Sequence, residues 1–206
     1  AGLRPDARVH GVLPEPDRAD SSLGLVFQDR HDVVGAILGD RRRSARRGLV
    51  SVDVWRQPRV TIISTGNEII APGELMRPAG VYDSNSQVLA DAVREQGAIA
   101  HFGGIIRDDV DELRSAMQSA LKDSDIVLLS GGTSKGRGDL CYRVVSELSD
   151  PGIVVHGVAL KPGKPICLAV TAGKPLVILP GFPTSAIFTF HEFVAPVIRS
   201  LAGRQP

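Results

Sequence analysis

Hydrophobic and polar residues alternate with two different periods along the chain after residue 50, and each period predicts one type of element. Alternation with a period of two is typical of a half-buried strand, and a short continuous apolar run is typical of a buried one. The strands predicted in this way are 50–54, 59–64, 99–106, 125–129 and 152–160, followed by a hairpin of 167–170 and 176–179 around the turn 171–174.

Amphipathic stretches between these runs predict the helices. Residues 84–87 have the form of a capping box and open a helix that we expect to end before Gly97. Asp109 and Asp139 are expected to cap the next two helices, and the last helix covers 183–201 with a bend at Pro196. Strands and helices in this order predict a three-layer α/β/α domain with a mostly parallel sheet and one antiparallel strand pair.

The first 48 residues differ from the rest of the chain. They contain three prolines, many charged residues and a run with five arginines in seven positions, 41–47, and only 23–27 and 33–38 suggest ordered pieces. Clustered arginines could contact nucleic acid or phosphate, but no aromatic or helix-turn-helix pattern accompanies them. We therefore interpret 1–48 as a partly ordered segment or linker and 49–206 as the α/β domain, and we expect no nucleic-acid partner.

Composition limits the class of protein. The chain has 206 residues, of which 43% are hydrophobic and 23% charged, and its formal charge of +1 argues against general polyanion binding. No apolar window approaches the ~18 residues of a membrane span, and the first residues lack the apolar core of a secretory signal. A cytoplasmic protein with no membrane partner is the expectation. Cys141 and Cys167 form no metal or disulfide motif, so we expect both to be buried.

Three predicted strand ends carry turns that suit anions. Residues 130–139 follow an apolar run and have four glycines in eight positions, so backbone N–H groups can face an oxyanion. Residues 161–165 (KPGKP) place two ammonium groups on a stiff turn, and 179–185 lead from a strand into a helix through Pro183. Strand ends of an open parallel sheet gather at one edge, so we predict that these turns open into a common cleft.

Familiar nucleotide and nucleophile motifs are absent from the sequence. The glycines of 131–138 do not keep the spacing of a dinucleotide-binding fingerprint. Residues 157–164 have one residue too many for a phosphate-binding loop of an NTPase, and Pro165 stands where the magnesium-binding hydroxyl would be. Without a nucleophile-elbow motif, covalent catalysis has little support.

Five segments in order, each at a predicted strand-to-helix junction, form a more specific pattern. They are 64–69 with Pro72 and Gly73 after it, 81–85, Asp108 with Asp109, 131–139, and 161–165 followed by 180–183. With these segments, residues 50–203 resemble the central domain of the MoeA/gephyrin-E family, the molybdopterin molybdenumtransferases. The resemblance implies molybdate-dependent cleavage of adenylylated molybdopterin with insertion of molybdenum into the dithiolene, Mg²⁺ as a helper, a small pterin substrate, and a homodimer in the full-length enzyme.

The resemblance also implies roles for individual residues. Glu68, Asp83 and Asp139 would be catalytic, with Glu68 and Asp139 as Mg²⁺ ligands, since carboxylates are the hard oxygen donors that this ion prefers. The molybdate site would consist of Lys161, Lys164, Pro165 and Ser185. Molybdopterin and its phosphates would contact Thr65, Gly66, Ser84, Asn85, Asp108, Gly131, Gly132, Thr133, Ser134, Gly136, Pro180 and Gly181. The plainer alternatives are helix caps for the carboxylates, exposed turn lysines, and a tight turn without a ligand.

Other functions stay open at this point. A molybdopterin adenylyltransferase of the MogA/MoaB type shares the glycine loop, but would have Gly-Gly-Thr-Gly where this chain has Gly132, Thr133 and Ser134. A CinA-like domain and a non-catalytic module that binds pterin or molybdate are further alternatives. Phe182, where the family usually has Asn, and the basic stretch 135–138 suggest a divergent branch. Family enzymes carry further N- and C-terminal parts, so we expect an excised domain or a reduced relative.

Overall fold

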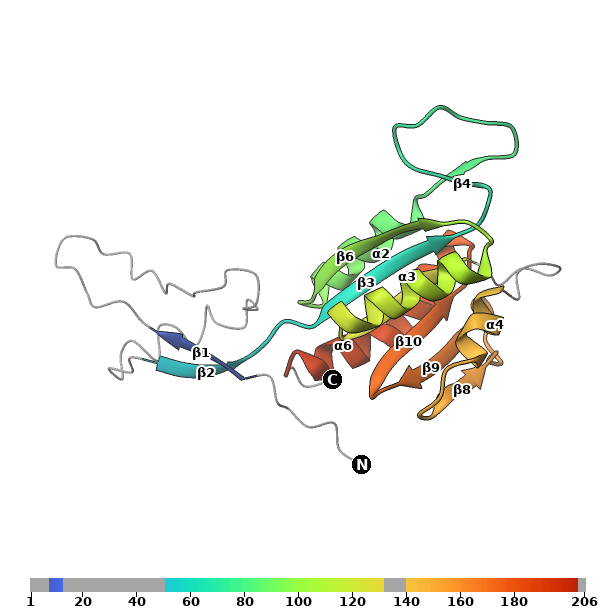
Figure 1. The fold of residues 1–206 in the computed structure, drawn as a ribbon. Coiled ribbons are helices and arrows are strands. Elements are labelled where there is room, and N and C mark those ends of the chain that lie inside the picture. Colours follow the sequence, from blue (N-terminus) through green and yellow to red (C-terminus); the bar gives the residue numbers. More distant parts are fainter. Residues whose placement is uncertain (1–7, 13–50, 132–139, 204–206) are drawn as a thin grey trace, which may run out of the picture.

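A six-stranded mixed sheet forms the centre of the molecule (Figure 1). The computed structural model describes residues 8–12, 51–131 and 140–203. The sheet has the strand order β6-β3-β7-β10-β9-β8. The strands are β3 (Arg59–Thr65), β6 (Ile99–Ile106), β7 (Ile126–Ser130), β8 (Gly152–His156), β9 (Cys167–Thr171) and β10 (Lys174–Leu179). Neighbours among β6, β3, β7 and β10 pair in parallel, whereas β9 is antiparallel to both β10 and β8.

Helices cover both faces of this sheet. They are α2 (Asn85–Glu95), α3 (Val110–Asp123), α4 (Leu140–Ser146), α5 (Pro183–Thr189), the π-helical turn η1 (Phe190–Val194) and α6 (Ala195–Leu201). Side chains of α2, α5, η1 and α6 share one buried cluster with the sheet, and those of α3 and α4 share the other. The predicted α/β/α domain with its mostly parallel sheet is therefore confirmed, including the hairpin of β9 and β10.

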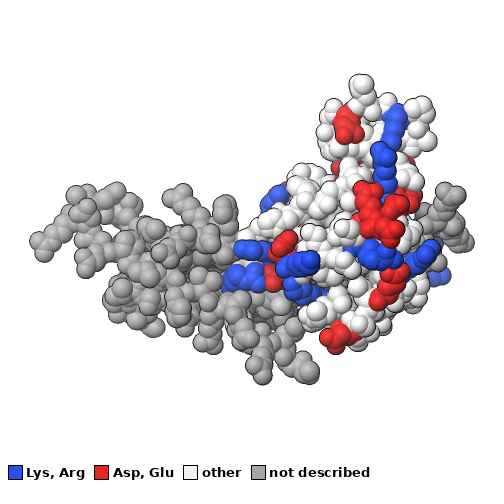
Figure 2. Space-filling view, viewed as in Figure 1, with Lys and Arg blue, Asp and Glu red and all other residues white. Residues whose placement is uncertain are grey.

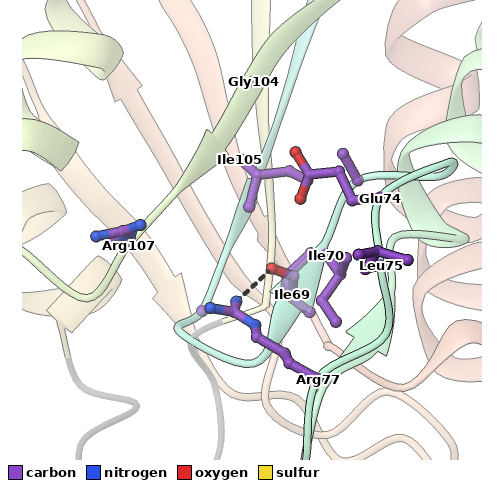
Figure 3. A pocket seen from close by; sticks show the side chains of 10 residues that line it. Ile69, Ile70, Glu74, Leu75, Arg77, Gly104, Ile105 and Arg107 are labelled. Carbon is purple, nitrogen blue, oxygen red and sulfur yellow. Dashed lines mark hydrogen bonds between the residues drawn. The ribbon is translucent and has the colours of Figure 1, made fainter.

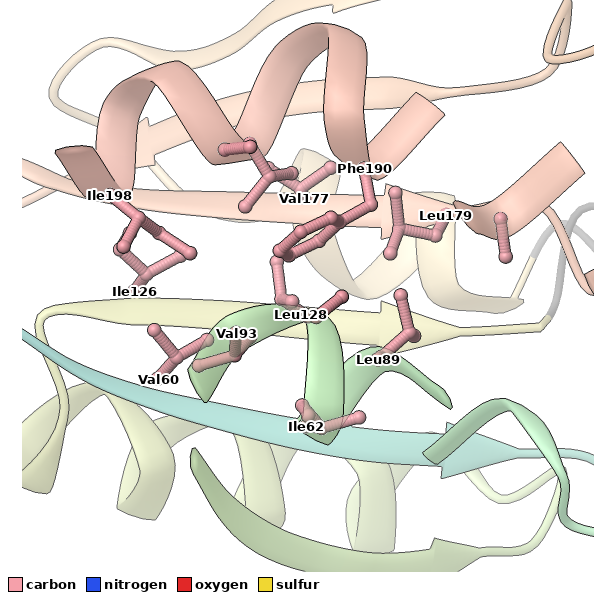
Figure 4. Close-up of a cluster of buried hydrophobic side chains, with 14 of the residues drawn as sticks. Val60, Ile62, Leu89, Val93, Ile126, Leu128, Val177, Leu179, Phe190 and Ile198 are labelled. Carbon is pink, nitrogen blue, oxygen red and sulfur yellow. The ribbon is translucent and has the colours of Figure 1, made fainter. Parts of the chain in front are cut away.

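Alternation along β3 divides its side chains between the two clusters. Val60 and Ile62 point into the first cluster, and Ile63 points into the second. In the first cluster the aromatic ring of Phe190 and the side chain of Ile198 pack against the sheet (Figure 4). Strands buried on both faces are largely apolar, which explains the apolar residues at successive positions in the middle of β3 and along β7.

Two small strand pairs lie outside the central sheet. The predicted strand at 50–54 exists as β2 (Ser51–Trp55), and it pairs antiparallel with β1 (Arg8–Val12), which the sequence did not predict. The second pair joins β4 (Ile69–Ile70) to β5 (Val81–Tyr82) in parallel, and residues 71–80 connect them in a loop that extends from the domain (Figure 1). The segments 23–27 and 33–38 and the arginine run lie outside the described residues.

Three predicted element boundaries need correction or detail. The side chain of Ser84 makes no capping hydrogen bond; instead Asp83 Oδ1 accepts a hydrogen bond from the N–H of Ser86 at 3.0 Å, so the cap lies one residue earlier. The strand predicted over 152–160 ends at His156, because the next backbone N–H groups bond to the turn at 161–166. In the last helix, the change of helical type at η1 immediately precedes the region of Pro196.

Asp109 caps α3 as predicted, since its Oδ1 accepts hydrogen bonds from the N–H groups of Asp111 and Glu112, both at 2.9 Å.

On the face shown in Figure 2, acidic and basic side chains are interspersed rather than separated into patches of one charge. At the surface of the domain, the Arg114 guanidinium contacts the carboxylates of both Asp111 and Glu147. Within the described part of the chain, no helix has the length and apolar character needed to cross a membrane.

Candidate functional site

A cavity of about 570 Å³ opens at the carboxyl ends of β3, β7 and β10. It lies at the edge of the parallel sheet, which is where ligands bind in open α/β folds. Most of the predicted site residues that the structure describes line it: Thr65, Glu68, Asp83, Ser84, Asn85, Gly131, Pro165, Pro180, Gly181 and Ser185. Segments that are distant in the sequence thus meet at one cavity.

Asn85 holds three of these segments together. It is the first residue of α2, and its Nδ2 donates hydrogen bonds to Ser130 Oγ and to the carbonyl oxygen of Gly181, both at 2.9 Å. One amide group therefore links the start of α2 to the end of β7 and to the turn after β10. This contact sets the position of the cavity wall.

Gly131 occupies a position that only glycine fits. Its φ is +110°, and a Cβ there would lie 2.5 Å from the carbonyl oxygen of Thr65. The N–H of Gly131 donates to the carbonyl oxygen of Leu179 at 3.3 Å, so the start of the glycine loop is held between β3 and β10. Gly181 lies directly beside it, since a Cβ on Gly181 would be 3.5 Å from the Cα of Gly131.

Two carboxylates line the cavity in different surroundings. Asp83 is 7% exposed and caps α2, whereas Glu68 is exposed and its carboxylate lies against Gly66. Both offer the oxygen donors that suit Mg²⁺. The described residues contain no group of three or more His, Cys, Asp or Glu side chains that could hold a metal ion. The second predicted Mg²⁺ ligand, Asp139, lies outside the described residues.

The lysine turn borders the cavity through its last proline. Pro165 lines the cavity, while Lys161 and Lys164 are exposed and do not line it. The carbonyl oxygen of Lys164 accepts a hydrogen bond from the N–H of Val158 at 2.9 Å. Gly163 is buried so closely against α5 that a Cβ there would lie 2.3 Å from Thr189 Cγ2. The turn is therefore fixed on the helix that also carries Ser185.

A second cavity, of about 450 Å³, lies beside β4 (Figure 3). Gly66, one of the predicted site residues, lines this second cavity instead of the first. Its wall includes Arg77, whose Nη2 donates to the carbonyl oxygens of Asn67 and Ile69 at 2.7 and 3.0 Å. Asp108 lines neither cavity; its N–H donates to Asn67 Oδ1 at 3.3 Å.

The central part of the glycine loop lies outside the described residues, and with it the predicted Gly132, Thr133, Ser134, Gly136 and Asp139. The common cleft for Asp139 and Lys164 therefore stays a prediction. Gly131, at the start of the glycine loop, and Pro165, which follows Lys164, do line the same cavity.

Sequence reasoning missed Ser64 and Ser130, which line the cavity at adjacent positions of the parallel strands β3 and β7. Each ends an apolar run, and this change from apolar to polar was the available signal. Both are at least nine-tenths buried.

Beneath the site, Cys141 Sγ lies 3.4 Å from Thr65 Oγ1, and burial raises the pKa of this thiol. Both cysteines are buried and free, as expected.

Fold and cavity together define a ligand-binding α/β domain, and comparison with known proteins gives its family. The family described as "Probable molybdopterin binding domain" matches residues 61–200, and the chain belongs to it. Molybdopterin molybdenumtransferase 2 of Mycobacterium tuberculosis is 36% identical over 186 residues, which are 86% of this chain and 44% of that protein. The chain therefore spans less than half of this relative.

Solved structures agree with this family. The MoeA molybdopterin biosynthesis protein of Pyrococcus horikoshii matches with a TM-score of 0.72 and 38% identity, over 82% of this chain and 41% of that chain. The expected resemblance to the central domain of molybdopterin molybdenumtransferases is thus confirmed. MoaB of Pyrococcus furiosus, described as a tungsten cofactor synthesizing protein, matches at 17% identity with a TM-score of 0.54, over 73% of this chain and 98% of that chain. This last likeness shows the fold alone.

Proposed function

We propose that this chain supplies the substrate-binding α/β domain of a molybdopterin molybdenumtransferase. In the proposed reaction, the phosphoanhydride of adenylylated molybdopterin is cleaved in the presence of molybdate, AMP leaves, and molybdenum enters the dithiolene. The observation that carries the proposal is the cavity of about 570 Å³ that segments from β3, β7 and β10 share with the start of α2 and with Pro165. The family match supports the pterin as ligand.

The anions of the reaction would bind where N–H groups and ammonium groups are available. Backbone N–H groups of the glycine loop, which begins at Gly131, would bind phosphate oxygens. Lys161 and Lys164 would bind molybdate, with Ser185 from the adjacent helix. The backbone of this turn is already fixed against α5, so only the lysine side chains must become ordered when they bind an anion, which supports this assignment.

Glu68 and Asp139 would hold Mg²⁺, and the ion would offset negative charge on the phosphate oxygens. The exposed position of Glu68 at the cavity supports this role, because a hydrated ion can reach the carboxylate. Asp83 would orient the substrate from the start of α2.

We also propose a homodimer for the complete protein. The apolar side chains of Leu75 and Met76 are 94% and 54% exposed on the loop 71–80, which supports a protein contact there.

Release of AMP tests the proposed reaction. The 206-residue chain is incubated with adenylylated molybdopterin, Mg²⁺ and molybdate, and AMP is quantified. We expect molybdate-dependent release that Asp139→Asn abolishes and that Glu68→Gln lowers at least about a hundredfold. Glu74→Gln is the matched control, because Glu74 is an exposed glutamate that lines the second cavity and not the first.

Other outcomes would contradict the proposal. Formation of adenylylated molybdopterin from ATP and molybdopterin would assign the chain to adenylyltransfer, and saturable binding without turnover would assign it to a non-catalytic binding module. If Glu68→Gln and Glu74→Gln released AMP at the same rate, Glu68 would have no part in the reaction.

A further inference from the structure

The amide of Asn85 is oriented so that only its oxygen is available to a ligand. Both acceptors of its Nδ2 group, Ser130 Oγ and the Gly181 carbonyl oxygen, are protein atoms at 2.9 Å. Its Oδ1 is buried and has no hydrogen-bond partner among the described residues. A primary amide has two donors and one acceptor oxygen. Asn85 lines the cavity and its donors are already used, so its oxygen is the group left for a ligand.

Ser64 adds a second unpaired group to the same cavity. Its side chain is 2% exposed, and its Oγ has no partner in the part of the chain that the structure describes. Ser64 lies beside Ser130 in the register of β3 and β7, and Ser130 is bonded to Asn85. Buried polar atoms are nearly always hydrogen-bonded, so two unpaired ones on one cavity indicate a ligand that completes them.

The charges of the remaining wall disfavour direct contact of a phosphate with Ser64 and Asn85. Its charged side chains are the carboxylates of Glu68 and Asp83, and none of the described lining residues is Lys or Arg. A phosphate group brings acceptors and negative charge, and it would meet further acceptors and negative charge here. Tyr82 and Phe182 line the same cavity and offer aromatic surface to a flat ring.

We propose that Ser64 and Asn85 form a subsite for the N–H-bearing edge of a planar aminoheterocycle, while the phosphates of the ligand lie toward Gly131 and Pro165. The inference rests on the proposed function and narrows it, since the proposed substrate contains two such rings, a pterin and an adenine. It also narrows the expected role of Asn85 from a contact to molybdopterin or its phosphates to a contact to a ring.

Binding of ligand pairs that differ by one amino group tests this subsite. Affinities are measured by calorimetry with the full chain in EDTA, so that no divalent ion contributes. Pterin is compared with lumazine, in which oxygen replaces the 2-amino group, and AMP with purine riboside monophosphate, which lacks the 6-amino group. We expect one pair to show an about tenfold loss without the amino group, and that pair identifies the ring in the subsite.

Two serine variants separate binding from folding. Ser64→Ala removes a hydroxyl that has no protein partner among the described residues, so we expect heterocycle affinity to fall about five- to tenfold with no loss in Tm. Ser124→Ala is the matched control: Ser124 is 3% exposed, but its hydroxyl is bonded to Thr61 Oγ1 away from the cavity. This variant should lower Tm and leave affinity unchanged.

Three results would overturn the subsite. They are equal affinities within both ligand pairs, an unchanged heterocycle affinity in Ser64→Ala, and an equal loss of affinity for inorganic phosphate in that variant. The proposed reaction can fail separately. AMP release together with an unaffected Ser64→Ala would reject only the subsite, and reduced heterocycle binding without AMP release would reject only the reaction.

Discussion

The two ends of β3 and β7 use polar residues in opposite ways. At the amino end, both carboxylate oxygens of Asp125 accept hydrogen bonds from the Arg56 guanidinium, at 2.9 and 2.6 Å, and the N–H of Arg59 donates to Oδ2 at 2.7 Å. The hydroxyls of Thr61 and Ser124 are bonded to each other. At the carboxyl end, Ser64 Oγ and Asn85 Oδ1 are buried and unpaired among the described residues.

This difference separates polar groups that hold the fold from polar groups that can bind. A buried pair satisfies its own hydrogen bonds and contributes to stability, whereas an unpaired buried group costs free energy until a ligand completes it. Stability should therefore respond to changes at the amino end, and binding should respond to changes at the carboxyl end. One change at the carboxyl end should nevertheless lower stability, because the backbone at Gly131 leaves no room for a side chain.

Gly131→Ala should have the largest effect on stability. Its Cβ would meet the Thr65 carbonyl oxygen at 2.5 Å at a φ of +110°, so we expect the free energy of unfolding to fall by about 3 kcal/mol. Gly173→Ala is the control, because Gly173 also has a positive φ, +72°, but a Cβ there meets nothing within 4 Å. It should cost about 1 kcal/mol. Equal losses in urea denaturation would show that the close approach to Thr65 does not matter.

Asp125→Asn should weaken the amino end by about 2 kcal/mol at pH 7, since it removes a charge-assisted contact to Arg56. Burial opposes ionisation of Asp125, but the Arg56 guanidinium and the Arg59 N–H hold the pKa of its carboxyl below the usual range. The stabilisation is thus present above the unfolded-state pKa of about 3.9 and is lost as pH falls through the lower folded-state pKa.

Urea denaturation from pH 7 to pH 2 measures this effect. The stabilities of the wild type and Asp125→Asn should differ at pH 7 and converge at the acid end, and AMP release per folded molecule should be equal. Asp91→Asn, at an exposed carboxylate of α2, should leave the urea midpoint nearly unchanged. A difference between the wild type and Asp125→Asn that persists at pH 2 would mean that packing rather than charge is responsible.

Lys164→Ala should act on binding without acting on stability. Loss of one ammonium contact to a dianion should raise the molybdate concentration that gives half-maximal AMP release about tenfold. Its Tm should not change, because the Lys164 side chain is exposed and only its backbone holds the turn. Lys122→Ala, an exposed lysine in the last turn of α3, is the control. The same molybdate requirement in both variants would remove Lys164 from the molybdate site.

The smallest expected effect concerns the two cysteines, which are buried and free. Burial raises the pKa of the Cys167 thiol to about 11, so only about one molecule in a thousand carries the thiolate at pH 8. Iodoacetamide at this pH should therefore modify neither cysteine in the folded chain within the time that fully labels the chain in urea. Rapid labelling of Cys141, which contacts Thr65, would show that the floor of the cavity opens.

Local patterns predicted most of the elements of the central domain. The strand 99–106 has the bounds of β6, and Asp109 caps α3, because apolar periodicity and capping residues act over a few neighbouring positions. The prediction that Ser84 caps α2 was wrong. The carboxylate of Asp83 can accept hydrogen bonds from the same N–H groups, and the sequence alone does not show which of the two side chains accepts them. Likewise β1 was missed, since its partner β2 lies some forty residues away in the sequence.

By itself, the sequence determined the layered α/β fold and the turns at the strand ends, since periodicity, glycine and proline act locally. Only the tertiary structure decided which of their polar groups stay unpaired. Ser64 and Ser130 become neighbours through the register of β3 and β7, and the Asn85 amide is oriented by acceptors from β7 and from the turn after β10. Hydrogen bonding between segments far apart in the chain depends on how the strands pair, and no local pattern records it.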